Sequence, residues 1–445
     1  MNTILPTSHE LDEMFSQAGR VLAAKPRIIV SPQIRSAAMM KQDAAATEKL
    51  LDLIELTIER LFGGDMVRVA RWLGYSDTVL RWVQASPRLD RRHVLVRSDI
   101  YDDQGQPKML ELNLGSSVGG LLEASFHSIL LKLPSVREAV RKQEAEWLEP
   151  LSEWAWLVVR SFLSHYTNPL MAFVESDFSM PAMQATLNDI ADRFHEITKT
   201  RVTVCTPKEL ERRKDGLYAR GEKVDVIYRL FDLEDLQRSP SEFEHILDAL
   251  EDRLVEMPMG FSCRIAGSKA LFALLSDPAY QTGLSVEDTE WVRRHIPETR
   301  LLTTRNRAYA LRERERLLIK PADGYGGAGI ICGWEASEAE WGTRIASYLS
   351  SASQVARAVV QERITPSTGP VVIAKPGGAV YQEQASILWG CYLFGNRHIG
   401  HVLRTKEITE SSVINYANGA AIGPVFYSEE RERTDARAID TDFMP

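Results

Sequence analysis

The chain has 445 residues, of which 44% are apolar and 26% charged, which is the composition of a globular protein with a sizeable core. Its length predicts two or three packed units at roughly 100–200 residues per unit. The 53 Lys and Arg against 61 Asp and Glu give a net charge of −8, which disfavours proteins that coat nucleic acids or membrane surfaces.

The first 92 residues are expected to form a helical region. Apolar residues between Leu50 and Phe62 recur at spacings of three and four, so they share one face of a helix. Gly63 and Gly64 then supply a C-terminal stop. A second helical stretch is indicated over residues 72–83. This region is predicted to serve packing rather than chemistry.

A β-hairpin is predicted after His93. Two short apolar runs, 94–96 and 109–112, flank the turn-forming residues 102–107. Alternation along a strand places polar side chains in pairs on a common face: Arg97 with Asp99, and Glu111 with Asn113. Mg²⁺ prefers oxygen ligands, so Glu111 and Asn113 are candidate metal ligands. A solvent-facing pair on an edge strand is the alternative.

A glycine- and serine-rich segment, residues 115–120, follows the hairpin directly. The hydroxyls of Ser116 and Ser117 and the exposed backbone amides suit a carboxylate ligand. The alternative is that a serine caps a helix start. The two interpretations are compatible because a helix N-terminus is itself an anion site.

Residues 166–260 alternate between strand and helix patterns. Strands are predicted at 170–174, 201–205 and 224–231, with a helix over 180–198 between the first two. This order is βαβ-like and predicts an α/β unit.

A glycine-rich loop, Lys320–Gly329, lies between two predicted strands, 317–319 and 330–333. It is neither a Walker A loop, which needs Lys-Ser/Thr after its glycines, nor a dinucleotide fingerprint, which must open a helix. A glycine-rich hairpin preceded by a lysine suits the covering of a triphosphate, since backbone amides and the ammonium face its oxygens. An ordinary surface turn is the alternative. Flanking helices are predicted at 241–256, 267–276 and 337–351, and a strand at 358–361.

Potential cations gather in a predicted strand near the C-terminus. Arg404 is suited to clamp a carboxylate through two hydrogen bonds. His398 and His401 suggest zinc, but that interpretation is disfavoured because the sequence places no third ligand. Residues 428–445 are strongly charged and are expected to fray as a tail.

The four cysteines, Cys205, Cys263, Cys332 and Cys391, show no metal-finger or disulfide-framework spacing, which indicates a reducing compartment. No basic stretch followed by an apolar run opens the chain, and no window approaches roughly 18 uninterrupted apolar residues. A cytoplasmic protein without membrane or nucleic-acid partners is therefore expected.

Seen together, the motifs resemble a known family. They are the RSD at 97–99, ELNLGSSVGGL at 111–121, AGSK at 266–269, IKPADGYGG at 319–327 and IGHVLRTK at 399–406. Their order resembles the circularly permuted ATP-grasp ligases, most closely eukaryotic-type glutathione synthetase and more loosely glutathionylspermidine synthetase. The resemblance implies an α/β (α+β) ATP-grasp fold. Its lobes would be 93–165 and 261–427, with an α/β substrate-binding lobe at 166–260.

The resemblance also implies roles for individual residues. Arg97 would lie beside the transferred phosphoryl group, and Arg404 would be catalytic and contact the substrate. The remaining substrate contacts would be Ser116, Ser117, Tyr228 and Arg229. The metal ligands would be Glu111, Asn113 and Asp323. The ATP contacts would be Lys269, Lys320, Gly324, Gly326, Gly327, Gln361, Glu362, Ile364 and Lys406.

The sequence departs from the family in three places. The family's glycine-rich loop carries a glutamate as a metal ligand. The acid in the corresponding loop here is Asp323, which comes one position earlier. The serine loop is one residue shorter. The segment at Tyr228 and Arg229 keeps its arginine but lacks the family's Arg-Asp-Gly-Tyr run.

The resemblance implies an ATP- and Mg²⁺-dependent carboxylate–amine ligase that works through an acyl phosphate. Its substrates would be a small-molecule carboxylate and an amine, such as amino acids, short peptides or polyamines, and a homo-oligomer is compatible with the sequence. The alternatives are a small-molecule kinase and a degenerate ATP-grasp protein that binds nucleotide without turnover.

Overall fold

The computed structural model describes residues 6–18, 27–86, 89–324, 326–350, 358–377, 379–408, 413–415 and 418–429. Most of the predicted charged tail, from residue 430 onward, lies outside the described residues. Within the described segments, no helix is both long and apolar enough for a membrane crossing.

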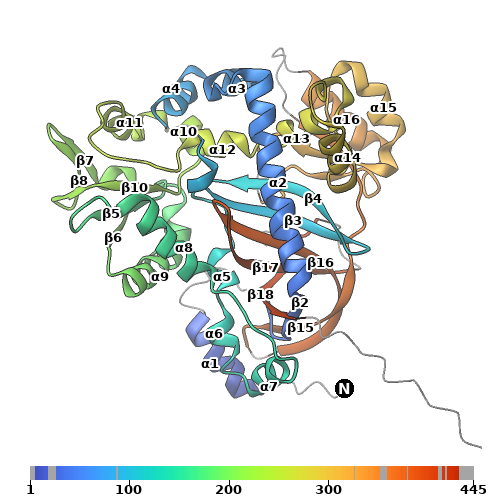
Figure 1. Ribbon diagram of the computed structural model, residues 1–445, viewed down its shortest axis with the longest axis horizontal. Coiled ribbons are helices and arrows are strands. Elements are labelled where there is room, and N and C mark those ends of the chain that lie inside the picture. The colour runs from blue at the N-terminus through green and yellow to red at the C-terminus, as the bar shows by residue number, and fades with distance from the viewer. Residues whose placement is uncertain are drawn as a thin grey trace, which may run out of the picture.

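An eight-stranded mixed sheet forms the centre of the molecule (Figure 1). Seven strands follow the order β15-β1-β18-β17-β16-β3-β4, and β2 pairs with β18. Because β15 also pairs with β16, the strands β15, β1, β18, β17 and β16 form a closed ring of pairings. The strands are β1 (Ile28–Ile29), β2 (Gln33–Ser36), β3 (Leu95–Asp103), β4 (Gln106–Leu114), β15 (Thr368–Lys375), β16 (Ala379–Phe394), β17 (Arg397–Glu407) and β18 (Ala421–Ser428).

The long helix α2 (Ala37–Phe62) runs across one face of this sheet (Figure 1). Ser36 caps its N-terminus by accepting a hydrogen bond from the Met39 amide, and Gly63 ends it at φ 67°. The predicted helix and its glycine stop are therefore confirmed. The other N-terminal helices are α1 (Ser8–Ala18), α3 (Met66–Leu73) and α4 (Asp77–Ala85).

The N-terminal region also contains the strands β1 and β2, which the helical prediction does not include. Ile29 pairs with Ile373 of β15, and Ile34 pairs with Phe426 of β18. Their partners lie more than 300 residues away in sequence, so tertiary pairing rather than local pattern makes these strands.

The predicted βαβ unit is confirmed. Strand β5 (Leu170–Val174) pairs in parallel with β6 (Arg201–Cys205) and β10 (Val226–Arg229), and α9 (Met180–Thr198) connects β5 to β6. A small antiparallel sheet lies beside them: β7 (Leu210–Arg213), β8 (Gly216–Ala219) and β9 (Glu222–Val224). The surrounding helices are α5 (Leu121–Ala124), α6 (His127–Leu130), α7 (Pro134–Lys142), α8 (Pro150–Val158), α10 (Leu233–Arg238), α11 (Glu244–Glu251) and α12 (Phe261–Ala266).

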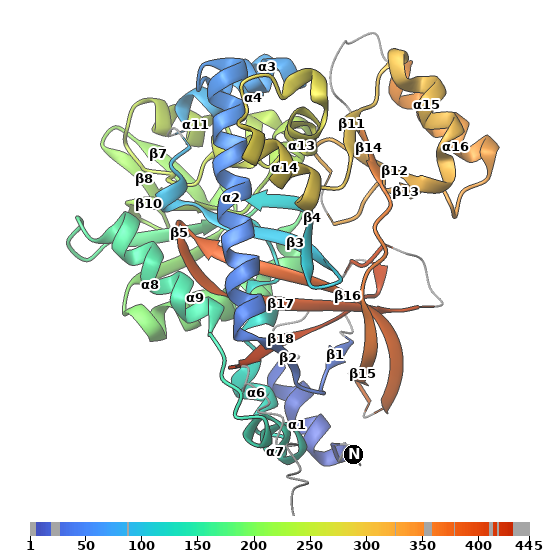
Figure 2. The same ribbon diagram turned by 45° about the vertical axis from the view of Figure 1, so that its right-hand side comes forward.

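A fourth sheet and two helices form a lobe that projects to one side (Figure 2). Its strand order is β11-β14-β12-β13. Strands β12 and β13 pair antiparallel around the glycine-rich loop, as predicted. The strands are β11 (Thr299–Leu301), β12 (Leu317–Pro321), β13 (Ile331–Cys332) and β14 (Ala358–Glu362). The helices are α15 (Arg307–Arg312) and α16 (Glu338–Leu349), with α13 (Lys269–Ser276) and α14 (Val286–His295) beside the lobe.

Candidate active site

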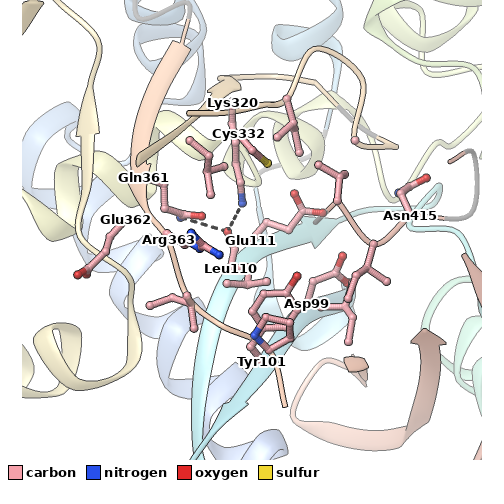
Figure 3. A pocket seen from close by; sticks show the side chains of 18 of the residues that line it. Asp99, Tyr101, Leu110, Glu111, Lys320, Cys332, Gln361, Glu362, Arg363 and Asn415 are labelled. Atoms are coloured by element: carbon pink, nitrogen blue, oxygen red, sulfur yellow. Dashed lines mark hydrogen bonds between the residues drawn. The ribbon is translucent and has the colours of Figure 1, made fainter. Parts of the chain in front are cut away.

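The hairpin β3–β4 and the four-stranded sheet of the projecting lobe line a first pocket with a cavity volume of about 120 Å³ (Figure 3). Lys320 of β12 and Gln361 of β14 reach across it. Lys320 Nζ donates to the Leu110 carbonyl at 3.3 Å, and Gln361 Nε2 donates to the same oxygen at 3.4 Å. Both residues are buried, so the two sheets meet through fixed polar contacts.

The first pocket combines apolar walls with polar ends. Its apolar side chains come from separate elements: Leu318, Ile330, Ile364, Leu388 and Ile414. Arg363, also in the lining, lies over the Trp334 ring at 4.3 Å from the centroid. Such a pocket suits a flat, largely apolar ring whose charged extension leaves toward Lys320 and Glu111.

A second, larger pocket, with a cavity volume of about 400 Å³, adjoins the first. Asp99 lies between two arginines that line it. Arg97 Nε donates to Asp99 Oδ1 at 2.8 Å, and Arg404 Nη1 donates to Asp99 Oδ2 at 3.2 Å. Burial opposes the charge on Arg97, but Asp99, Tyr392 and Glu111 together outweigh burial and raise the pKa of Arg97. Asp99 thus orients both guanidinium groups at the pocket wall.

Glu111 stands where the two pockets meet. Its Oε2 lies 3.2 Å from Lys269 Nζ, and its Oε1 accepts from Asn113 Nδ2 at 3.3 Å. Burial raises the pKa of Glu111, but the nearby charges of Lys269, Lys320 and Arg97 together lower it by more than burial raises it, so the net pKa is lowered. The carboxylate is therefore ionised, as a metal ligand must be.

The hairpin register explains this arrangement. Arg97 is paired with Asn113, and Asp99 with Glu111, across β3 and β4. Directly opposed residues share one face of a sheet, so these polar side chains face the pockets together. The predicted pairing of alternate polar residues is confirmed for the hairpin.

The glycine-rich loop lies over the junction. Gly327 lines the first pocket, whereas Gly324 and Gly326 line the second. Lys269 Nζ donates to the Gly324 carbonyl at 2.6 Å. Gly327 adopts φ 73°, and a Cβ there would lie 3.1 Å from Val413, so a larger residue would be strained and crowded.

Acidic side chains that belong to none of the predicted motifs also line the second pocket. Glu175 follows β5, and Asp232 follows β10. Because these two strands are parallel, their carboxyl ends lie at the same edge of the sheet, and both acids line the same pocket. Glu123 and Asp235 line the same pocket. Burial raises the pKa of Glu175 to about 7. The signal available in the sequence was an acid directly after each predicted strand.

Arg264 of α12 is a further lining residue that the motifs did not reveal. Its Nε donates to Asp232 Oδ2 at 2.9 Å, and its Nη2 donates to the Asp323 carbonyl at 2.7 Å. It therefore links Asp232, in the pocket lining, to the base of the glycine-rich loop.

The structure places several expected site residues away from both pocket linings. The Ser116 hydroxyl donates to the Arg229 carbonyl, and Tyr228 accepts from Trp154 Nε1 at 3.0 Å. Arg229 is buried over the Phe261 ring at 4.4 Å from its centroid. These three residues support the wall of the pocket rather than its surface.

The remaining expected residues divide similarly. Ser117 lines the second pocket, and Glu362 and Ile364 line the first. Lys406 Nζ donates to the Val413 carbonyl at 3.4 Å, beside the first pocket. Asp323 lies outside both linings. The short helix α5 is capped by Gly120, with no side-chain cap, so the serine-cap alternative is not found.

Comparisons with known proteins bear on the fold. No protein-family model matches the chain, and no curated protein matches it in sequence. A solved structure of a glutathione synthetase-like effector from Globodera pallida, in its apo form, is similar to it with a TM-score of 0.61 at 12% identity, covering 95% of this chain and 96% of that one. The chain has a glutathione synthetase-like fold.

Two further structures are more distant. One is assigned to a gamma-glutamylcysteine synthetase from Methylobacillus flagellatus, with a TM-score of 0.43, 9% identity and coverage of 88% and 86%. The other is D-alanyl-alanine synthetase A from Vibrio cholerae, with a TM-score of 0.26, 13% identity and coverage of 50% and 67%. At these scores neither structure carries an argument.

Proposed function

We propose that the protein is an ADP-forming, ATP-dependent carboxylate–amine ligase of the circularly permuted ATP-grasp type. One observation carries the proposal. The ionised Glu111 lies close to the cations Lys269, Lys320 and Arg97, where the apolar first pocket meets the charged second pocket. Residues 93–165 and 261–427 would supply the ATP-grasp lobes, and residues 166–260 the substrate-binding lobe.

The first pocket would hold ATP. Its apolar walls suit the adenine, with Gln361, Glu362 and Ile364 at the edge formed by the end of β14. The phosphates would extend toward Lys320 and Lys269, beneath the amides of Gly324, Gly326 and Gly327. Desolvated cations and fixed amides stabilise the charge that moves during phosphoryl transfer.

Glu111 and Asn113 would hold Mg²⁺. The donor set fits, because an ionised carboxylate and an amide oxygen two residues apart on one strand are hard oxygen ligands. When bound, the ion neutralises negative charge on the phosphates. Asp323 lies outside both pocket linings and gives the metal site no support.

Arg404 would bind the substrate carboxylate in the second pocket, and Arg97, in the same lining, would lie beside the transferred phosphoryl group. One carboxylate oxygen attacks the γ-phosphorus, the bond to ADP breaks, and an acyl phosphate forms. The amine nitrogen then attacks the acyl carbon, phosphate departs and the nitrogen loses a proton. Ser117 would contact the acceptor, and the Glu175 end of the pocket suits the amine.

The alternative of a nucleotide-binding protein without turnover is favoured by one observation, the position of Asp323 outside both linings. A screen separates the possibilities. Pairs of amino acids, short peptides and polyamines are incubated with ATP and Mg²⁺, and ADP and products are measured by mass spectrometry. The ligase predicts ADP only when an acid and an amine are both present, with an amide product. A stable phosphorylated product would show a kinase, and nucleotide binding without ADP would contradict both enzymes.

The raised pKa of Glu175 predicts a pH-dependent stability. Burial raises this pKa from 4.5 to about 7, so the folded state binds the proton more tightly than the unfolded state. The resulting stability is present below pH 4.5 and is lost as the pH rises through about 7. The Glu175→Gln variant lacks this pH dependence. The difference in unfolding free energy, variant minus wild type, should therefore be larger at pH 8 than at pH 5, by at most about 3 kcal/mol. Urea unfolding of both proteins at the two pH values measures the effect, and an equal difference at both would contradict it.

A further inference from the structure

Cys391, His398 and His401 form a cluster outside the proposed active site. Cys391 lies on β16, and the two histidines lie on β17. One potential ligand atom from each residue lies within 4.8 Å of the others. Cys391 and His401 are fully buried, whereas His398 keeps partial exposure. The sequence suggested the histidine pair but did not reveal the cysteine as a third donor.

A β-bulge brings the three side chains to one face. In a regular strand, residues three apart point to opposite faces, so His398 and His401 would diverge. Here Cys391 pairs with His401 and Leu393 pairs with His398, which leaves Ile399 as an extra residue between them. Gly400 adopts φ 138°, and a Cβ there would lie 2.6 Å from Pro150. The backbone is thus shaped so that both imidazoles face Cys391.

The buried ion pair between Asp43 and Arg35 orients His401. Its Nε2 lies 3.1 Å from Asp43 Oδ2 on α2. Arg35 holds that carboxylate through Nε at 2.6 Å and Nη2 at 2.9 Å. Since a carboxylate only accepts, Nε2 carries the proton and Nδ1 presents its lone pair inward. Carboxylate–histidine pairs of this kind orient and strengthen metal-binding imidazoles.

His398 completes the donor set. Its Nε2 lies 3.0 Å from His401 Nδ1. Two nitrogens bound to one tetrahedral metal at about 2.05 Å stand about 3.3 Å apart, so these two nitrogens would need to separate by only a few tenths of an ångström. Without a metal, the same two atoms form a direct hydrogen bond.

We propose that Cys391, His398 and His401 bind a zinc-type divalent cation, with the fourth position open on the His398 side. A thiolate and two imidazoles are ligands that favour zinc over magnesium. The ion would join β16 to β17 at the bulge. Arg404 follows three residues later on β17 and lines the second pocket, so the site would brace the strand that carries it.

Cobalt binding tests this proposal. The full-length protein is treated with chelator, kept in excess Mg²⁺ and titrated with Co²⁺ under reducing conditions. We expect one equivalent to bind, with visible bands of tetrahedral cobalt and a thiolate-to-cobalt charge-transfer band. Cys391→Ala should abolish the charge-transfer band, and His398→Ala should weaken Co²⁺ binding on the order of 100-fold or more. Cys205→Ala and Glu111→Gln should retain the spectrum.

A second readout keeps the test independent of ligase activity. Zn²⁺ should raise the melting temperature of the wild-type protein and not that of His398→Ala, because a ligand that binds only the folded state stabilises it. His398 is the most exposed of the three residues, so this variant is the one expected to fold. The proposal is overturned if Co²⁺ gives no thiolate band in the wild type, if the band survives in folded Cys391→Ala, or if Zn²⁺ shifts both proteins equally.

Discussion

Replacing Glu111 with Gln should lower ADP release on the order of 10²-fold or more with the fold intact, as loss of one preorganised electrostatic contact does. The amide keeps the shape of the side chain but removes the charge that would hold Mg²⁺. It also removes the partner of Lys269, 3.2 Å away. The rate is measured as ADP release with the substrate pair found in the screen, over a range of Mg²⁺ concentrations.

The matched control is Glu138→Gln on α7, where the carboxylate pairs with the surface residues Arg141 and Lys142. It should leave ADP release unchanged. Circular dichroism and thermal melting establish that each variant is folded. Near-wild-type turnover in folded Glu111→Gln would remove the proposed metal site, whereas an equal loss in both variants would mean that the assay reports stability rather than catalysis.

Replacing Lys320 with Ala should have an effect of similar size, on the order of 10²-fold in kcat/KM for ATP. The side chain reaches from β12 across the first pocket toward β4 and Glu111 (Figure 3). Burial lowers the pKa of Lys320 to about 8, although Glu111 opposes this. The free enzyme should therefore lose this positive charge, and with it kcat/KM for ATP, as the pH rises above about 8.

Lys320→Arg and Lys142→Ala are the controls for this effect. Arginine stays charged throughout, so Lys320→Arg should recover part of the rate and flatten the decline above pH 8. Lys142 is a surface residue of α7, and its removal should change neither rate nor pH profile. If Lys320→Ala keeps the wild-type rate, or if Lys320→Arg declines above pH 8 as the wild type does, Lys320 does not contact the nucleotide phosphates.

Much of the fold was readable from local pattern. Two apolar runs around a dense turn predicted the hairpin β3–β4, and strand alternation correctly placed Arg97 with Asp99, and Glu111 with Asn113, on a common face. The cross-strand register that sets Asp99 opposite Glu111 was not predicted. Strands β5 and β6 and helix α9 matched their predicted limits, because periodicity and flanking residues agree there. The glycine-rich hairpin was likewise visible, since its glycines separate two short apolar strands.

Other features depend on contacts that sequence spacing does not record. Strands β1 and β2 form because they pair with β15 and β18, which lie far away in the sequence. Tyr228 and Arg229 lie next to Leu230, which lines the second pocket, yet their side chains pack inward against Trp154 and Phe261. The cysteine–histidine cluster needs a bulge at Ile399 and a cysteine on the neighbouring strand. In each case, contacts between residues far apart in the sequence select one of several locally similar conformations.

The fate of a carboxylate oxygen tests the central claim most directly. The acid substrate is labelled with ¹⁸O in its carboxyl group and incubated with ATP, Mg²⁺ and the amine. If the carboxylate is activated as an acyl phosphate, one labelled oxygen leaves with the phosphate, and the amide retains the other. We predict one ¹⁸O in each inorganic phosphate released. Unlabelled phosphate formed alongside the amide would contradict the proposed mechanism.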